Sequence, residues 1–237
     1  MTRRASSAFP FRLFMCALFI TDLAPTRNRL GGPIYILAVA FSTTAWACSL
    51  ASTAYCDYVK RDVTLVPGQN STLPPELEDE LALAFEDHGV GFWAWSLGGQ
   101  CERYCNQIGA CPDFDTKFRS AKAFTAVTDV LGGIATFVLW MMVCGAMDRG
   151  ILRACSLFFF LCTLFEGLTL LILRSNICTQ PGFFAYLSPF WPKWDLPEVQ
   201  SVSCSLSTGS SLSIGSTVCW FFAGVAAAAV QARDKAP

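Results

Sequence analysis

Residues 151–173 read ILRACSLFFFLCTLFEGLTLLIL and contain one acidic residue, Glu166, and one basic residue, Arg153. At about 1.5 Å per residue, a helix of this length crosses the ~30 Å hydrocarbon core of a bilayer. Three further apolar stretches of similar length lie at 33–54, 123–147 and 212–232. The sequence therefore predicts four transmembrane helices. A soluble all-helical protein is the alternative, but it would have to bury four helices that are apolar on every side.

The composition of the whole chain is also that of a membrane protein. Only 15% of the 237 residues are charged and 53% are hydrophobic, whereas a soluble domain has about 25% charged residues. The net charge of −1 gives no reason to expect a nucleic-acid partner. A single histidine, His88, argues against histidine-ligated metals and serine–histidine catalysis. The sequence has no phosphate-loop, dinucleotide or metal-site motif, so we expect neither an enzyme nor a cofactor.

The basic residues predict which ends of the helices face the cytoplasm. Residues 1–32 contain five arginines and one acid, Arg149 and Arg153 lie in or near the tight turn at 148–150 between the second and third spans, and Arg233 and Lys235 lie in the tail at 233–237. Residues 57–115, by contrast, contain eleven acidic and three basic residues. The positive-inside rule then places both termini in the cytoplasm and the loops 55–122 and 174–211 outside. We expect a multi-pass protein of the plasma membrane or of a secretory-pathway membrane.

Glycosylation and disulfide signals agree with this orientation. Asn70-Ser71-Thr72 is an N-glycosylation sequon in the first outer loop. Six cysteines lie in or beside the outer loops, as expected in an oxidising compartment. They are Cys56, Cys101, Cys105, Cys111, Cys178 and Cys204. We favour the pairs Cys101–Cys111 and Cys178–Cys204, because each closes a loop within one segment. That choice leaves Cys56 to pair with Cys105.

The N-terminal segment, residues 1–32, resembles a signal peptide because arginines precede the apolar residues 13–20. If it were cleaved, the first span would enter with its N-terminus outside, which would put the sequon and the six cysteines in the cytoplasm. We therefore predict an uncleaved interfacial helix at residues 9–23. Ala8-Phe9-Pro10 is similar to the plastid-targeting motif of algae. That motif should follow a hydrophobic core and here precedes one, which disfavours plastid import.

The two outer loops differ in character. In the first loop, residues 58–66 and 90–97 have strand-like patterns, and an acidic amphipathic helix is expected at 76–89. A unit of this size needs staples, so we predict a small sheet held by disulfides. In the second loop, residues 182–194 read GFFAYLSPFWPKW. This aromatic stretch is either an interfacial belt or a contact surface for a lipid or another membrane protein.

Two acids lie within the predicted spans. Glu166 is in the third span and Asp129 in the second. Threonines accompany both acids along their helices, at Thr163, Thr169, Thr125 and Thr128. We expect the acids to share a hydrogen bond or a proton, or to pair with Arg174 or Lys122. One interpretation is an interhelical hydrogen bond that fixes packing, and the other is an ion or proton site.

Other small residues in the spans have structural or modification interpretations. Three cysteines near the cytoplasmic face, Cys16, Cys144 and Cys155, are either palmitoylation sites or small buried hydrophobes. Small residues that let helices approach closely are Gly132, Gly133, Gly215, Gly224 and the run 226–229.

Gly91-Phe92-Trp93, followed by Cys101 and Cys111 and then by FRSAKAF at 118–124, resembles the signature of the claudin and peripheral-myelin-protein-like tetraspan families. The order of the spans, the long first loop, the tight inner turn and the short tail are also similar. The chain departs from the pattern in its longer gap from Trp93 to Cys101, in Cys105, and in the acidic insertion near residues 68–88. Its tail also lacks the hydrophobic last residue of claudins. Residues 164–178 and 204–216 further resemble four-span proteins of diatoms and related algae.

The resemblance implies a four-helix transmembrane bundle with a small disulfide-stapled extracellular β-sheet. In such a fold Trp93 would anchor the sheet near the bilayer surface, and Cys101–Cys111 would lock two strands. It also implies a non-enzymatic role in membrane organisation, adhesion or scaffolding, with membrane lipids and the protein itself or another membrane protein as partners. The alternative is a channel or transporter accessory subunit, or a small transport protein, that uses the intramembrane acids.

Overall fold

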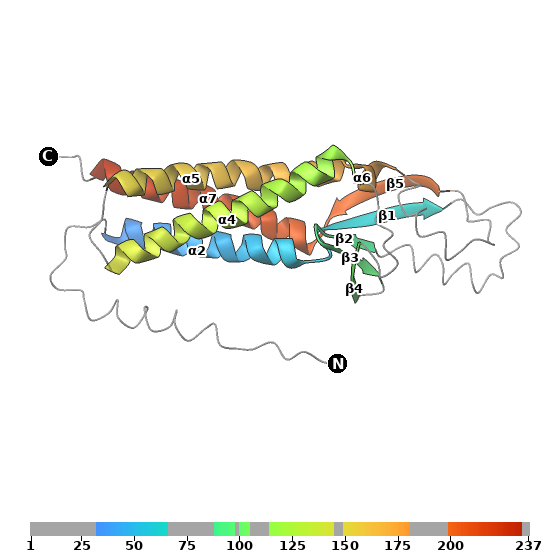
Figure 1. The fold of residues 1–237 in the computed structure, drawn as a ribbon, viewed down its shortest axis with the longest axis horizontal. Coiled ribbons are helices and arrows are strands. Elements are labelled where there is room, and N and C mark those ends of the chain that lie inside the picture. Colours follow the sequence, from blue (N-terminus) through green and yellow to red (C-terminus); the bar gives the residue numbers. More distant parts are fainter. Residues whose placement is uncertain are drawn as a thin grey trace, which may run out of the picture.

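Four long helices form a bundle in the computed structural model, which describes residues 32–65, 88–97, 100–104, 114–144, 149–180 and 199–233 (Figure 1). They are α2 (Gly32–Ala54), α4 (Thr116–Cys144), α5 (Arg149–Leu168) and α7 (Thr208–Arg233). A 3-10 helix, η1 (Thr169–Arg174), and the short α6 (Asn176–Thr179) extend α5. All four spans are long and apolar enough to cross a membrane, which indicates a multi-pass membrane protein.

Apolar side chains on the outside of the bundle are those expected in contact with lipid. Phe137 is 66% exposed, Val130 60% and Leu157 59%, and a soluble monomer does not present such a continuous apolar surface. Inside, Phe159 stacks on Trp220 with ring centroids 5.5 Å apart. The bundle is therefore apolar on its outer face, as hydropathy predicted, and its interior contains an apolar core around this ring pair.

Glycine allows close helix contacts at three of the four positions expected from the sequence. A Cβ on Gly132 would lie 2.5 Å from the Trp220 ring, and one on Gly133 would lie 2.9 Å from Trp46. Gly224 faces Phe160 at 3.1 Å. The expectation for Gly215 is wrong, because no atom lies within 4 Å of the position where its Cβ would be.

A five-stranded antiparallel sheet covers one end of the bundle, in the order β4-β3-β2-β1-β5 (Figure 1). The strands are β1 (Val59–Leu65), β2 (His88–Val90), β3 (Ala94–Leu97), β4 (Gln100–Arg103) and β5 (Val199–Leu206). The predicted strand at 58–66 corresponds to β1. Its pairing with β5, from Val59 opposite Leu206 to Leu65 opposite Val199, joins the two loops in one sheet.

The single strand predicted at 90–97 is wrong: β2 and β3 are two strands joined by a turn at residues 91–93. Gly91 explains the turn, since its backbone lies against the end of α2. A Cβ on Gly91 would overlap the carbonyl oxygen of Tyr55 and lie 2.9 Å from Cα of Cys56. Of the acidic helix predicted at 76–89, the last two residues belong to β2, and the rest lies outside the described residues.

Two disulfides tie the sheet to the bundle. Cys178 of α6 bonds to Cys204 of β5, the pair expected from the sequence. Cys101 of β4, however, bonds to Cys56 at the end of α2. The predicted pairs Cys101–Cys111 and Cys56–Cys105 are thus corrected. The β2–β4 meander folds back over the end of α2 and brings residues 45 positions apart within 5.6 Å between Cα atoms.

The α4 helix begins at Thr116, before residue 123 where the second span was predicted to start. Asp115 caps it, because its Oδ1 accepts a hydrogen bond from the Phe118 amide at 2.9 Å. Its Oδ2 accepts another from the Asn176 amide at 3.1 Å. One carboxylate therefore fixes the start of α4 and joins it to α6.

Several sequence predictions concern residues outside the described part of the chain. These are the interfacial helix at 9–23, Cys16, the sequon at Asn70, Cys105, Cys111 and the aromatic stretch at 182–194. They remain predictions, apart from the pairings of Cys105 and Cys111 that are corrected above.

Candidate functional site

The two intramembrane acids are joined by one serine of α2. Ser49 Oγ lies 2.7 Å from Oδ1 of Asp129 on α4. The same oxygen lies 3.0 Å from Oε2 of Glu166 on α5. The hydrogen bonds therefore run from each acid to Ser49, a third residue that the sequence analysis did not identify, and not from one acid to the other.

Further hydroxyl groups extend this cluster from both acids. Thr53 donates to Oδ2 of Asp129 at 3.0 Å, and Ser213 donates to Oε1 of Glu166 at 2.7 Å. Ser213 in turn lies 3.2 Å from the Thr169 hydroxyl. We call these six residues, together with Tyr58, the polar cluster: Ser49, Thr53, Asp129, Glu166, Thr169, Ser213 and Tyr58.

Tyr58 connects the polar cluster to the sheet. Its hydroxyl lies 2.7 Å from that of Thr169, and the residue is fully buried just before β1. Burial raises the pKa of Tyr58 to about 12, because the charged phenolate would lose its hydration. The tyrosine is therefore a neutral hydrogen-bonding group where the sheet meets the bundle.

The two contacts of Ser49 limit how many protons the acid pair holds. The Ser49 hydroxyl has one proton and can donate to only one carboxyl group. Both contacts can be hydrogen bonds at the same time only if one of the two carboxyl groups donates a proton of its own to Ser49. Burial agrees, since Glu166 is 0% exposed and Asp129 is partly exposed. We therefore expect the shared proton on Glu166, the more buried of the two acids.

The other expected partners of the acids lie elsewhere. Thr125 and Thr128 donate to backbone carbonyls of their own helix. Lys122 Nζ lies 3.8 Å from the centre of the Trp93 ring. No Lys or Arg nitrogen among the described residues forms a salt bridge with Asp129, whose side-chain contacts are the hydroxyls of Ser49 and Thr53.

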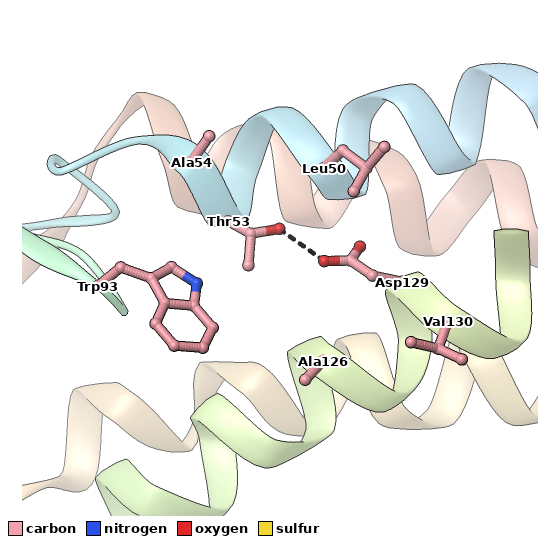
Figure 2. A pocket seen from close by; sticks show the side chains of 7 residues that line it. All are labelled: Leu50, Thr53, Ala54, Trp93, Ala126, Asp129 and Val130. Atoms are coloured by element: carbon pink, nitrogen blue, oxygen red, sulfur yellow. Dashed lines mark hydrogen bonds between the residues drawn. The ribbon is translucent and has the colours of Figure 1, made fainter.

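Asp129 also faces a groove of about 440 Å³ between α2 and α4 (Figure 2). The groove is lined by Leu50, Thr53, Ala54, Trp93, Ala126, Asp129 and Val130. Its α4 residues, Ala126, Asp129 and Val130, belong to a helix that crosses the bundle obliquely (Figure 1). Leu50 and Val130, 41% and 60% exposed, stand on the lipid-facing side. The groove therefore opens sideways toward lipid.

Trp93 closes the sheet end of this groove (Figure 2). It belongs to the turn between β2 and β3 and is 53% exposed. The Lys122 ammonium lies over its ring at cation–π distance. A half-exposed tryptophan beside a lysine is typical of the interfacial region of a membrane.

The bundle cysteines Cys155 and Cys144 provide no evidence of palmitoylation or metal binding. Cys155 is 3% exposed, in the same core cluster as Phe159 and Trp220. This corrects its interpretation as a palmitoylation site, because an enclosed thiol is not exposed to an acyl donor. Cys144 ends α4, and its side chain is outside the described part. Within the described ranges, no three His, Cys, Asp or Glu side chains gather as a metal site.

Comparison with protein-family models and with curated protein sequences finds no match to this chain. The site therefore has to be interpreted from its own geometry.

Sequence reasoning identified both acids but missed the hydroxyls that join them. Ser42, Ser49 and Ser52 are fully buried along one face of α2. Their spacing of seven and three residues is the helical repeat that places side chains on one face. This weak signal was available, but serines and threonines also occur in such helices for local reasons, since their hydroxyls can bond to the preceding turn.

Proposed function

We propose that the protein is a non-enzymatic, claudin-like four-span membrane protein that acts through its outer sheet in membrane organisation, adhesion or scaffolding. The observation that carries this proposal is the sheet itself. Both loops contribute strands to it, and each of its outermost strands, β4 and β5, is tied to a helix by a disulfide. A sheet held in this way presents a fixed surface away from the bundle, as a contact protein requires.

The edge strand β5 is the part of this surface best placed for contacts. Among the described strands it pairs on one side only, with β1. Its residues Ser203 and Ser205 are exposed. An edge strand offers unpaired backbone donors and acceptors to a second chain. A second copy of the protein is therefore the simplest partner, and another membrane protein is the alternative.

A transport or accessory role is the second candidate, favoured only by the acid pair. On the side of the acids away from the sheet, buried hydroxyl groups donate hydrogen bonds to backbone carbonyls. Ser42 donates to Val39, Thr136 to Ser42, and Ser156 to Gly224. The stacked rings of Phe159 and Trp220 lie among them. The described core thus offers no charged path toward the opposite end, and the contact role is the stronger proposal.

Site-specific photo-cross-linking in native membranes tests the proposal. A photoreactive amino acid at Ser203, on the exposed edge, should give adducts between the outer sheets of two copies. The same amino acid at Ala228, on the lipid-facing side of α7, is the matched control and should give lipid adducts. Recovery of a larger multi-span transporter from Ser203 would favour the accessory role. Equal protein adducts from both positions, or none from Ser203, would contradict a contact role for the sheet edge.

A further inference from the structure

The groove between α2 and α4 is a hollow on the part of the bundle expected to face lipid, with a carboxylate in its wall. Most of its lining is apolar or small, and Thr53 and Asp129 supply the polar groups (Figure 2). Because it opens sideways near the level of Trp93, the molecules that reach it are those of the membrane. An apolar chain fits against Leu50 and Val130, which are exposed at the end of the groove away from the sheet.

The carboxyl group of Asp129 favours binding of those membrane molecules that have a cationic group. Asp129 is the ionisable side chain among the groove-lining residues, and the hydroxyls of Ser49 and Thr53 each contact one of its oxygens. A carboxylate can accept about four hydrogen bonds in all, so acceptor capacity remains on the partly exposed side. An ionised acid at bilayer depth is unfavourable unless it is paired. A cationic partner in the groove would remove this penalty.

The described part of the chain does not supply that cation itself. Lys122 is two helical turns from Asp129, about 10 Å along the axis, and its ammonium lies over Trp93. A ligand ammonium bonded to Asp129 would lie deeper in the groove than Lys122. The small side chains of Ala54 and Ala126 leave room for it between the helices.

We propose that this groove binds a long-chain primary amine, an amphiphile of the sphingoid-base type. Its ammonium would donate to the carboxylate of Asp129, and its hydrocarbon chain would run along Leu50 and Val130 toward the centre of the bilayer. A primary ammonium has three N–H donors for the free acceptor sites of the carboxylate, whereas a quaternary ammonium has none. Trp93 would cover the ligand from the sheet side.

The test uses the purified full-length protein reconstituted in phosphatidylcholine vesicles. One probe is a long-chain primary amine with a photoreactive diazirine in its chain, and the other is its N-acetylated form, which has the same chain but no charge. After illumination, the labelled residues are located by mass spectrometry. We expect the amine to label α2 and α4 around Leu50 and Val130, about tenfold more than the neutral probe does. Tenfold corresponds to about 1.4 kcal/mol, the lower end of the range for a hydrogen bond to a charged group.

Two variants separate the groove from its surroundings. Asp129→Asn should reduce amine labelling to the level of the neutral probe. Ala126→Phe fills the groove from an exposed position and leaves the polar cluster intact, so it tests the site even if Asp129→Asn does not fold. Ala228→Phe makes the same replacement on the lipid-facing side of α7 and should leave labelling unchanged.

Equal labelling by both probes would mean that the groove holds neutral lipid only. Labelling that persists in Ala126→Phe would show that the amine binds elsewhere, and either result overturns the proposal.

Discussion

The hydroxyl group of Ser49 links the two acids inside the bundle. Ser49 lies within hydrogen-bond distance of two carboxyl groups and has one proton to give. Removing Ser49 would leave both acids short of a partner, whereas neutralising one acid preserves the arrangement. We expect this additional proton on Glu166, which is the more buried acid, where it would fill the contact that the single proton of Ser49 cannot fill.

The protonated state of Glu166 can be observed directly. Infrared spectroscopy of the protein in lipid at neutral pH should show the carbonyl stretch of a protonated carboxyl group. Glu166→Gln should remove this band and shift the thermal unfolding midpoint little, since the Gln amide can donate to Ser49 as the carboxyl does. Asp129→Asn should retain the band. A band that survives in Glu166→Gln and disappears in Asp129→Asn would mean that the proton lies on Asp129.

Tyr58 gives the protein a sensitivity to alkaline pH. Burial raises its pKa to about 12 from an ordinary value of 10, so the folded state holds this proton where the unfolded state has lost it. The stabilisation is therefore complete below pH 10 and is lost as the pH rises toward 12. The shift corresponds to about 2–3 kcal/mol.

The pH at which the protein unfolds measures this effect. Tyr58→Phe should unfold with a weaker pH dependence between about pH 10 and 12. Tyr55→Phe is the matched control, because Tyr55 is 46% exposed and three residues away. An alkaline transition equally steep in Tyr58→Phe and in the unmodified protein would assign the pH dependence to other groups.

At the scale of elements, the turn between β2 and β3 depends on one missing side chain. A Cβ on Gly91 would meet the backbone of Tyr55 and Cys56, which cannot move without displacing the end of α2. We expect Gly91→Ala to lower the free energy of unfolding by about 1–3 kcal/mol, as overpacking does. Gly215→Ala makes the same replacement in the middle of α7, where no atom is near. It should be neutral or stabilise the helix by up to about 1 kcal/mol.

Thermal unfolding of the two variants in the same detergent gives the comparison. If Gly91→Ala were as stable as Gly215→Ala, the close packing of the β2–β3 turn against α2 would be wrong.

The helices could be predicted because their signal is local, whereas the turn and one disulfide could not. Each span needs only its own run of apolar residues to be recognised. The pairing of Cys56 with Cys101 depends on how the β2–β4 meander folds over α2, which no short stretch of sequence encodes. The same holds for the site: Glu166 and Asp129 are conspicuous within apolar helices, but Ser49 becomes important only when three helices meet around it.

The disulfide pattern has a direct test. Non-reduced peptides of the protein from its native membrane should contain Cys56 linked to Cys101, and Cys178 linked to Cys204. Each link should disappear on reduction. A peptide that links Cys101 to Cys111 instead would restore the pairing favoured from the sequence and would contradict the placement of β4 beside the end of α2.

For the whole molecule, the arrangement of the helices determines which groups share a side of the membrane. Helix α2 begins and helix α7 ends at the end of the bundle opposite the sheet (Figure 1). Because both described disulfides belong to the sheet end, this end should face the oxidising compartment. We predict that the opposite end of the bundle faces the cytoplasm, as the positive-inside rule also predicts.

Glycosylation and tag accessibility test this orientation independently. With the sheet end in the secretory lumen or outside the cell, Asn70 should carry a glycan, and glycosidase treatment should lower the apparent mass of the protein by one glycan. Asn70→Gln should have the lower mass without treatment. A tag after residue 237 should react with antibody only once the cells are permeabilised. Because an unused sequon leaves the orientation open, the decisive contrary result is a C-terminal tag that is exposed on intact cells, which would invert the molecule and place its disulfide-bonded sheet in a reducing compartment.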